Sequence, residues 1–416
     1  MAFPIDRVRA QFPSLTDTDQ GHPRIYLDNP AGTQVPGQVI DAITDTLVHR
    51  NANLGGSFVT SVAAEEIVNS AHRKMAAFLG TDDPDEIIVG ANMTTLTFHL
   101  SRTICRDLQQ GDEIIVTRMD HEGNVAPWLE AAADKGLVVR WAEFNTDTWR
   151  IEPDHFKSLL NSRTKVVALN HTSNLTGSTN DVKQLVSLAK QAGAIVYVDA
   201  VQYAPHGLID VAAIGCDFLV CSAYKFFGPH MGIAWGRRSL LERMRAYKCR
   251  CVSEELPIKY ETGTPQIEQL AGLDGTVDYF AWLGESVGAK GSLREKIVAA
   301  FAAARVYERG LATRLIEGLR KLPAVTIVGP GPETETNPRV PTVSFTHKSV
   351  APSVIASTLA KSNVFVWSGH NYALGTVQKL GLNEEEGVLR IGIAQYNTDM
   401  EIDRVLGIVA DIVGRK

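Results

Sequence analysis

Long hydrophobic runs are absent from this chain of 416 residues. No apolar stretch approaches the roughly 18 residues that suggest a membrane-spanning helix. The start of the chain, Met1 to Arg7, also lacks the basic residues and the apolar stretch of a signal peptide. We therefore expect a cytoplasmic protein with no membrane partner.

An excess of basic residues is also missing. The chain has 41 Lys and Arg against 47 Asp and Glu, which gives a formal net charge of −6. Without a basic surplus to neutralise phosphates, nucleic acid is a poor candidate partner. The remaining composition, 44% hydrophobic and 21% charged, is typical of a globular protein, and the length allows two domains.

Cysteine is scarce, and its spacing follows no known motif. The five cysteines are Cys105, Cys216, Cys221, Cys249 and Cys251. None of them forms a C-x-x-C pair, so the sequence predicts neither a metal site nor a redox motif. We expect reduced thiols and no bound metal.

Between residues 85 and 236, short apolar runs alternate with stretches of helical periodicity. This pattern is typical of parallel strands buried on both faces by crossover helices. The clearest helix has Asp181 as its N-cap and Gly193 at its end. The sequence predicts an α/β domain with one mostly parallel sheet of seven strands: 86–89, 113–116, 137–140, 165–169, 194–198, 217–220 and 232–235.

The character of the sequence changes after about residue 280. Residues 295–322 are rich in Ala, Leu and Arg and contain no proline, which predicts a long helix leading out of the first domain. A smaller α+β domain should follow, with strands at 325–328, 342–345, 364–367 and 389–392 and helices near 350–361 and 401–413. We divide the chain into an N-terminal segment of the small domain (1–20), a large domain (21–280) and a small C-terminal domain (281–416).

The most informative local cluster is Asp217-Phe-Leu-Val-Cys-Ser-Ala-Tyr-Lys-Phe-Phe-Gly-Pro229, in which Lys225 follows a buried strand. An isolated lysine there would usually only extend its amine to solvent. However, the preceding strand ends at Asp199, and the carboxyl ends of neighbouring parallel strands open on one crevice, where α/β proteins bind ligands. A carbonyl-capturing lysine and an aspartate that holds a protonated ring nitrogen are the two groups that pyridoxal phosphate (PLP) requires.

On these residues the chain resembles the fold-type I PLP-dependent transferases of aminotransferase class V, and among them the cysteine desulfurase and selenocysteine lyase group. The similarity extends from Tyr26-Leu-Asp-Asn-Pro-Ala-Gly32 to Arg390-Ile-Gly-Ile-Ala-Gln-Tyr-Asn397. It implies that residues 21–280 form the PLP-binding domain, that the substrate is an α-amino acid, and that the protein is a homodimer with its active sites at the subunit interface.

The resemblance also implies a role for individual residues. Lys225 would form the internal aldimine and later move protons, Asp199 would pair with the pyridine nitrogen, and Gln202 would donate to the ring phenolate. His121 would stack on the ring and take part in catalysis. The other implied cofactor-binding residues are Thr94, Thr95, Asn174, Ser222, Tyr224 and, from the partner subunit, Thr264.

On the substrate side, the resemblance assigns Arg390 to the α-carboxylate, a task suited to a bidentate guanidinium, with Asn174 beside it. The nearest desulfurases read Arg-Thr-Gly-His-His-Cys-Ala where this chain reads Trp367-Ser-Gly-His-Asn-Tyr-Ala373. Tyr372 therefore stands in place of a nucleophilic cysteine, and a phenol lacks the sulfur chemistry of a thiolate. With Trp367 replacing an arginine and His370 nearby, the segment predicts a pocket for a side chain bulkier or less polar than that of cysteine.

We therefore predict a class V lyase or transferase of amino-acid metabolism that works through an external aldimine and a carbanion, with carbon chemistry of lyase, decarboxylase, aldolase or epimerase type. The alternative is a cysteine desulfurase or selenocysteine lyase that works without a cysteine at residue 372, with Cys249 or Cys251 as a substitute. A hypothesis of another class rests on Ser222-Ala-Tyr-Lys225, which matches the S-x-x-K motif of serine hydrolases. The companion motifs S-D-N and K-T-G are both missing from the sequence.

Overall fold

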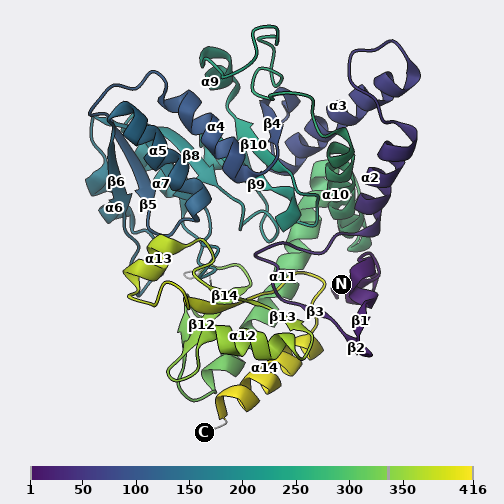
Figure 1. Cartoon of the computed structure of the whole chain (residues 1–416), viewed down its shortest axis with the longest axis vertical. Coiled ribbons are helices and arrows are strands. Elements are labelled where there is room, and N and C mark those ends of the chain that lie inside the picture. Colours follow the sequence, from purple (N-terminus) through teal and green to yellow (C-terminus); the bar gives the residue numbers. More distant parts are fainter. Residues whose placement is uncertain (1, 335–337, 415–416) are drawn as a thin grey trace.

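Two domains are visible in the computed structural model, which describes residues 2–334 and 338–414. The large domain occupies the upper part of Figure 1 and the small domain, which carries the C-terminal end, the lower part. Across the described residues, no helix is long and apolar enough to cross a membrane.

The seven predicted strands all occur, and they form a single sheet in the order β4-β10-β9-β8-β7-β5-β6. Their bounds are β4 (Ile87–Gly90), β5 (Glu113–Thr117), β6 (Val138–Ala142), β7 (Thr164–Asn170), β8 (Ile195–Asp199), β9 (Phe218–Ser222) and β10 (Gly232–Gly236). Strand β10 runs antiparallel to both of its neighbours, and the other pairs are parallel. The prediction of a mostly parallel sheet is confirmed.

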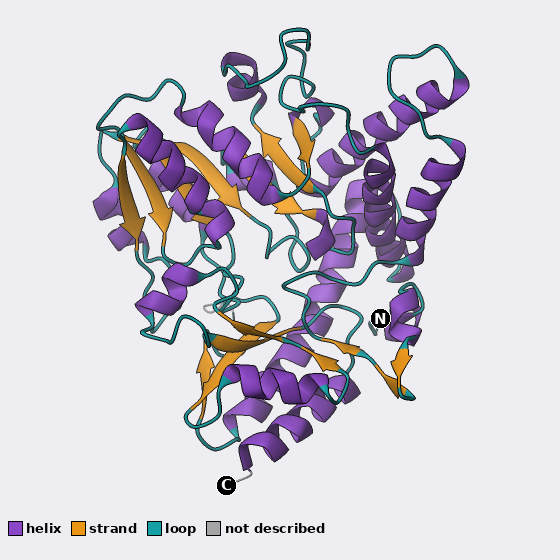
Figure 2. Ribbon diagram, viewed as in Figure 1, coloured by secondary structure: helices purple, strands orange, loops and turns teal. Residues whose placement is uncertain are grey.

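Helices pack on both faces of this sheet (Figure 2) because its strands are apolar on both sides. Along β5, Ile115 belongs to the core under α7 (Val182–Gln191), whereas Ile114 and Val116 belong to the core under α4 (Met93–Cys105) and α5 (Ala126–Lys135). The predicted cap of α7 is present, since the Asp181 carboxylate accepts a hydrogen bond from the Gln184 amide at 3.1 Å. The other helices that precede residue 290 are α1 (Ile5–Arg9), α2 (Gly37–His49), α3 (Val59–Leu79), α6 (Pro153–Leu159), α8 (Val211–Ile214), α9 (Arg238–Arg243) and α10 (Ile267–Ser286).

The small domain begins with α11 (Leu293–Arg320), the predicted long helix, whose first turn is closed by a capping box between Ser292 and Glu295. Its four-stranded antiparallel sheet has the order β11-β12-β15-β14. The bounds are β11 (Val325–Val328), β12 (Thr342–His347), β14 (Trp367–Gly369) and β15 (Val388–Gly392), with helices α12 (Pro352–Ala360), α13 (Leu374–Lys379) and α14 (Asp399–Gly414).

One predicted strand, 364–367, is wrong as a single element. Residues Val364–Phe365 form β13, which pairs in parallel with β3 (Ile25–Tyr26) near the start of the chain, whereas Trp367 begins β14 in the main sheet of the small domain. The chain changes sheets at Val366. The N-terminal segment also contains a short hairpin, β1 (Thr18–Asp19) and β2 (His22–Pro23).

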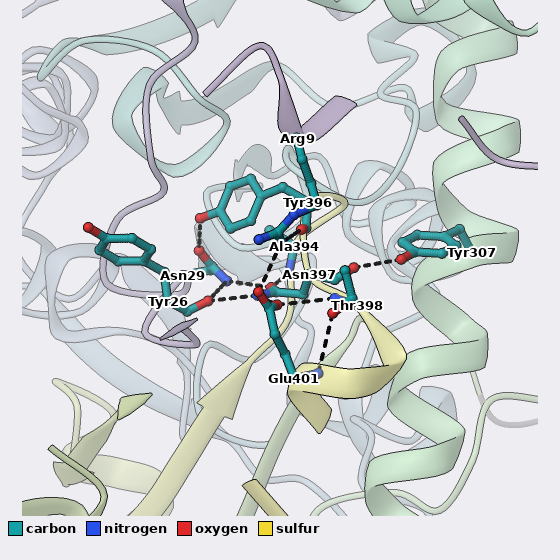
Figure 3. Close-up of polar contacts among 9 residues, drawn as sticks. All are labelled: Arg9, Tyr26, Asn29, Tyr307, Ala394, Tyr396, Asn397, Thr398 and Glu401. Carbon is teal, nitrogen blue, oxygen red and sulfur yellow. Dashed lines mark hydrogen bonds and ion pairs between the residues drawn. The ribbon is translucent and has the colours of Figure 1, made fainter. Parts of the chain in front are cut away.

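The start and the end of the chain are joined by a buried polar network (Figure 3). Asn29 Nδ2 donates to the carbonyl of Gly392 at 2.8 Å and to Asn397 Oδ1 at 3.2 Å, and its Oδ1 accepts a hydrogen bond from the Tyr396 hydroxyl. Arg9 adds a bond to the Tyr396 carbonyl at 2.6 Å. The two segments that mark the limits of the family resemblance are therefore bonded to each other.

The predicted domain limits fall close to, but not on, the packing boundaries. Ile25 and Leu27 lie in the core of the small domain, although the range 21–280 was assigned to the large domain. At the other limit, residue 280 lies inside α10, which continues to Ser286. Near the start of the chain, Val8 and Phe12 pack into the core of the large domain, whereas the sequence predicts that residues 1–20 belong to the small domain.

Candidate active site

A cavity of about 750 Å³ opens between the carboxyl ends of the large-domain strands and the small domain. It brings together most of the side chains that the sequence predicts, from segments far apart in the chain. The predicted residues that line it are Thr94, His121, Asn174, Asp199, Gln202, Ser222, Tyr224, Lys225, Trp367, His370, Tyr372 and Arg390. Thr95 and Thr264 are exposed outside this cavity.

Lys225 lies in a short 3-10 turn, Ala223–Lys225, directly after β9. Its Nζ donates to the carbonyls of Pro30 at 2.5 Å and Ala31 at 3.0 Å. Burial, followed by the charge of Arg390, lowers the pKa of the Lys225 amine to about 7. Near neutral pH a large share of this amine is therefore unprotonated and nucleophilic.

Asp199 ends β8 and is buried, with Oδ1 accepting a hydrogen bond from the Val201 amide at 2.8 Å. Burial raises the pKa of this carboxyl to about 7. Behind it lies Asp120, which is held by Thr117 and Asn124 at 2.5 and 3.0 Å. Burial, and then the charge of Asp199, raise the pKa of Asp120 well above its ordinary value. A cation in the cavity would favour the ionised form of Asp199.

At another wall of the cavity, the N-terminus of α4 meets the end of β9. Ser222 Oγ accepts a hydrogen bond from the Met93 amide at 3.1 Å, and Thr94 lines the cavity. The Thr95 amide and hydroxyl instead donate to Asn92 Oδ1, at 2.9 and 3.0 Å. The start of a 13-residue helix, with hydroxyls beside it, is a suitable place for a phosphate.

Glycine at position 232 allows this wall to form. A Cβ on Gly232 would lie 2.3 Å from the carbonyl carbon of Asn92, a distance that no side chain tolerates. Strand β10 can therefore approach the first turn of α4 only through a glycine.

His121 lines the cavity with a half-buried imidazole. Its Nδ1 accepts a hydrogen bond from the Gly123 amide at 2.9 Å, so the neutral ring carries its proton on Nε2. Burial, and then the charges of Lys225 and Arg390, lower the pKa of His121 to about 3. The ring stacks on that of Tyr372, with 5.3 Å between the centroids and 24° between the planes.

Arg390 lies in β15 and reaches the cavity from the small domain. Its Nη1 donates to the Asn174 carbonyl at 3.0 Å, while burial lowers the pKa of the guanidinium to about 9. Among the described residues, Arg390 Nε and Asn174 Oδ1 are buried without a hydrogen-bond partner. Buried polar groups are rarely left unpaired, so these atoms mark a place prepared for a ligand with an acceptor and a donor, as an amino-acid carboxylate and amine provide.

Two predicted residues have further contacts inside the protein. Gln202 Nε2 donates to Thr342 Oγ1 in β12 at 3.0 Å, which ties the large domain to the small one. The Tyr224 ring stacks on His230, with 4.8 Å between the centroids.

Some lining residues were not predicted from the sequence. Pro30 and Ala31 contribute carbonyl oxygens to Lys225, and a backbone contact leaves no pattern in the side chains. Glu384 and Glu385 reach the cavity mouth from the loop before β15. The run of three acids at 384–386 is the one signal that was available for them, and such a run is usually only a solvated surface.

Comparison with known proteins decides the family. The model of the aminotransferase class V family matches residues 25–405. The chain belongs to aminotransferase class V. An aminotransferase-like protein, FGM3, of Gibberella zeae is 32% identical over 97% of each chain. A cysteine desulfurase of Serratia proteamaculans is 30% identical over 98% of this chain and 97% of its own.

A solved structure agrees with this class V assignment over the whole length. The apo cysteine desulfurase of Thermococcus onnurineus NA1 superposes with a TM-score of 0.87 at 25% identity, covering 100% of this chain and 99% of the other. The predicted fold-type I architecture is confirmed. Enzymes of this family depend on PLP, which confirms the predicted cofactor class.

The residues present in this class V chain fit the cofactor. Lys225 offers an amine whose pKa is lowered to about 7, and Asp199 offers a buried carboxyl group whose ionised form a cation would favour. The N-terminus of α4 lies at the same cavity, with Thr94 and Ser222 in its lining. These three groups match the carbonyl, the ring nitrogen and the phosphate of PLP.

All five cysteines lie in the described part of the chain, and none of them lines this cavity. Burial raises the pKa values of the Cys105 and Cys216 thiols to about 12, and it also raises that of Cys221. Cys249 and Cys251 are exposed. Residue 372, which lines the cavity, is a tyrosine.

Proposed function

We propose that this class V protein is a PLP-dependent enzyme acting at Cα of an α-amino acid, with carbon chemistry of lyase, decarboxylase, aldolase or epimerase type. The observation that carries the proposal is that Lys225, Asp199 and Arg390 line one cavity to which no cysteine of the described chain contributes. The first two are the groups that PLP chemistry needs, and Arg390 has a free donor for a carboxylate.

Each residue has a definite task in this proposal. Bound PLP supplies a carbonyl that condenses with amines and a ring that accepts electrons from a bond broken at Cα. Asp199 holds the proton on the ring nitrogen, and Arg390 fixes the substrate carboxylate, which sets the bond to be broken. Lys225 Nζ, with its lowered pKa, takes and returns the proton at Cα.

A second candidate, sulfur or selenium release from cysteine or selenocysteine, is favoured by the name of the Serratia relative. It would need a thiolate. Tyr372 supplies none at the usual position, and the two exposed thiols, Cys249 and Cys251, lie outside the cavity of their own chain.

We also propose that the protein is a cytoplasmic homodimer in which Thr264 of one subunit approaches the cofactor phosphate of the other. Thr264 is exposed outside the cavity of its own chain. Apolar side chains are exposed on α2 and at the start of α3, among them Val48 at 66% and Val59 at 82%. Exposed apolar side chains of this kind suit burial by a second copy. The five free thiols support a reducing compartment.

A panel of amino acids added to the holoenzyme in heavy water tests the reaction. We expect α-proton exchange or carbon dioxide release with at least one amino acid, and no rapid sulfide or alanine release from cysteine. Sulfide release that is lost in Cys249→Ser or Cys251→Ser would instead establish the second candidate. As a control, Lys225→Ala should abolish borohydride-reducible attachment of PLP, and retained attachment would refute the lysine assignment.

A further inference from the structure

The mouth of the cavity is lined by groups that the proposed chemistry does not use. These are the rings of Trp367 and Tyr372, which are 51% and 64% exposed, and the carboxylates of Glu384 and Glu385. Glu384 Oε1 accepts a hydrogen bond from the neutral Gln378 amide at 3.0 Å. In the described part of the chain, neither carboxylate has an ion-pair partner.

The backbone holds the aromatic and acidic segments side by side. Strands β14 and β15 pair through Trp367 and Arg390, and the Gly369 amide donates to the Glu386 carbonyl at 3.1 Å. A Cβ on Gly387 would lie 2.1 Å from the carbonyl carbon of Gly369, so the backbones of the two segments pack directly against each other.

The position of Tyr372 is maintained against backbone strain. Asn371 and Tyr372 both have positive φ values, +50° and +59°. This left-handed conformation costs a residue other than glycine about 1–2 kcal/mol. The Tyr372 carbonyl accepts a hydrogen bond from the Glu122 amide at 2.8 Å, and its ring stacks on His121. Strain of this kind is concentrated at ligand sites.

The charged groups that line the cavity differ in burial. Among the residues that line the cavity, Arg390 and Asp199 are buried and Lys225 is half-buried, and Arg390 Nε has no hydrogen-bond partner in the described part of the chain. Glu384 and Glu385 are exposed at the mouth. An amino acid whose carboxylate is held by Arg390 therefore extends its side chain toward aromatic faces and negative charges. Aromatic faces and carboxylates both attract cations.

We propose that the substrate is an α-amino acid whose side chain carries a positive charge, bound between the rings of Trp367 and Tyr372 and the carboxylates of Glu384 and Glu385. This inference rests on the proposed function, because it requires Arg390 to hold the α-carboxylate. A neutral apolar side chain would leave the two carboxylates unused, and an anionic one would be repelled by them.

The test compares ligands of equal length and different charge on the holoenzyme. L-arginine is paired with neutral L-citrulline, and L-lysine with L-norleucine. Binding is followed by the absorbance of the cofactor and, independently, by quenching of tryptophan fluorescence. At low ionic strength, the cationic member of at least one pair should bind about tenfold more tightly or better, and the ratio should fall as salt is added.

The double variant Glu384→Gln/Glu385→Gln should reduce this ratio to less than about threefold. The matched control is Glu386→Gln, which makes the same kind of charge change in the same loop, but whose carboxylate bonds to the Ser353 amide and hydroxyl at 3.1 and 2.9 Å instead. It should keep the full ratio. Equal binding within both pairs, or a ratio that survives in the double variant, would overturn the proposal. A complete failure of every amino acid to bind would overturn the proposed function itself, and this inference with it.

Discussion

The Lys225 amine donates to two carbonyls, and its environment leads to a prediction about pH. A lowered pKa means that the amine loses its proton at about pH 7 instead of above pH 10. The rate at which PLP attaches to the apoprotein should rise about tenfold per pH unit below pH 7 and level off above it. Stopped-flow absorbance measures this rate, and a rise that continues to pH 10 would contradict the prediction. The charge of Arg390 is the second cause of the lowered pKa of Lys225, so Arg390→Ala should move the midpoint of the pH dependence of this rate to higher pH.

The position of Arg390 leads to a prediction about the binding of amino acids. Because its guanidinium is prepared for a carboxylate, Arg390→Ala should weaken amino-acid binding about 30-fold to 1,000-fold, the effect of 2–4 kcal/mol for a buried charged hydrogen bond. The affinity for PLP should change far less. Cofactor absorbance during titration reports both affinities. Arg309→Ala, at an exposed position on α11 outside the cavity, is the control and should change neither. Equal losses of the two affinities would argue against the carboxylate role.

Single residues also show the limits of reading this site from the sequence. The Thr94-Thr95 pair at the start of a helix predicted hydroxyls near a phosphate. Only Thr94 lines the cavity, because Asn92 caps the helix and its Oδ1 accepts hydrogen bonds from both the amide and the hydroxyl of Thr95. The choice between two neighbouring hydroxyls depends on the geometry of the cap, which the residue types alone do not reveal.

At the scale of elements, the contact between β14 and the loop before β15 makes a further prediction. Gly387→Ala would place a methyl group against the Gly369 backbone and force the Trp367–Tyr372 segment away from the mouth. Amino-acid binding should fall about tenfold or more while PLP attachment is retained. Gly381→Ala is a matched control, since Gly381 also has a positive φ, +64°, but has nothing within 4 Å of the added Cβ. It should lower the free energy of unfolding by about 1–2 kcal/mol and leave binding unchanged. Equal binding in both variants would contradict the role of the close contact.

The elements differ in how far the sequence could predict them. The seven strands of the large sheet were predictable because each is a continuous apolar run between turn residues, which is what burial on both faces produces. The break at Val366 was not predictable, because it follows from the pairing of β13 with β3, some 340 residues earlier in the chain. The presence of Glu384 and Glu385 in the cavity lining was not predictable for the same reason, because it depends on the pairing of β14 with β15.

At the scale of the whole molecule, a shared active site makes a prediction about mixed dimers. In the proposed homodimer, each cavity uses its own Lys225 and the Thr264 of its partner. Lys225→Ala and Thr264→Glu should each abolish turnover. When the two variants are dissociated together and reassembled, heterodimers should regain one working site of two, because that site combines an intact lysine with an intact threonine. Activity measured against mixing ratio checks this.

The control for that experiment is a mixture of Lys225→Ala with Asp199→Asn. Both changes affect groups that a subunit supplies to its own cavity, so no heterodimer contains a site with both intact. Recovery with this pair, or no recovery with the first, would contradict a site shared between subunits.

The position of β10 in the large sheet has a consequence for the synthesis of the chain. Because β10 is inserted between β4 and β9, Ile88 of β4 cannot pair until Ala234, its partner on β10, has been synthesised. At typical translation rates of about 5–20 residues per second, the delay is roughly ten seconds to half a minute. During that time β4 has no strand beside it, and open strand edges invite pairing with other chains. A nascent chain that stops before residue 232 therefore carries an unpaired edge on β4.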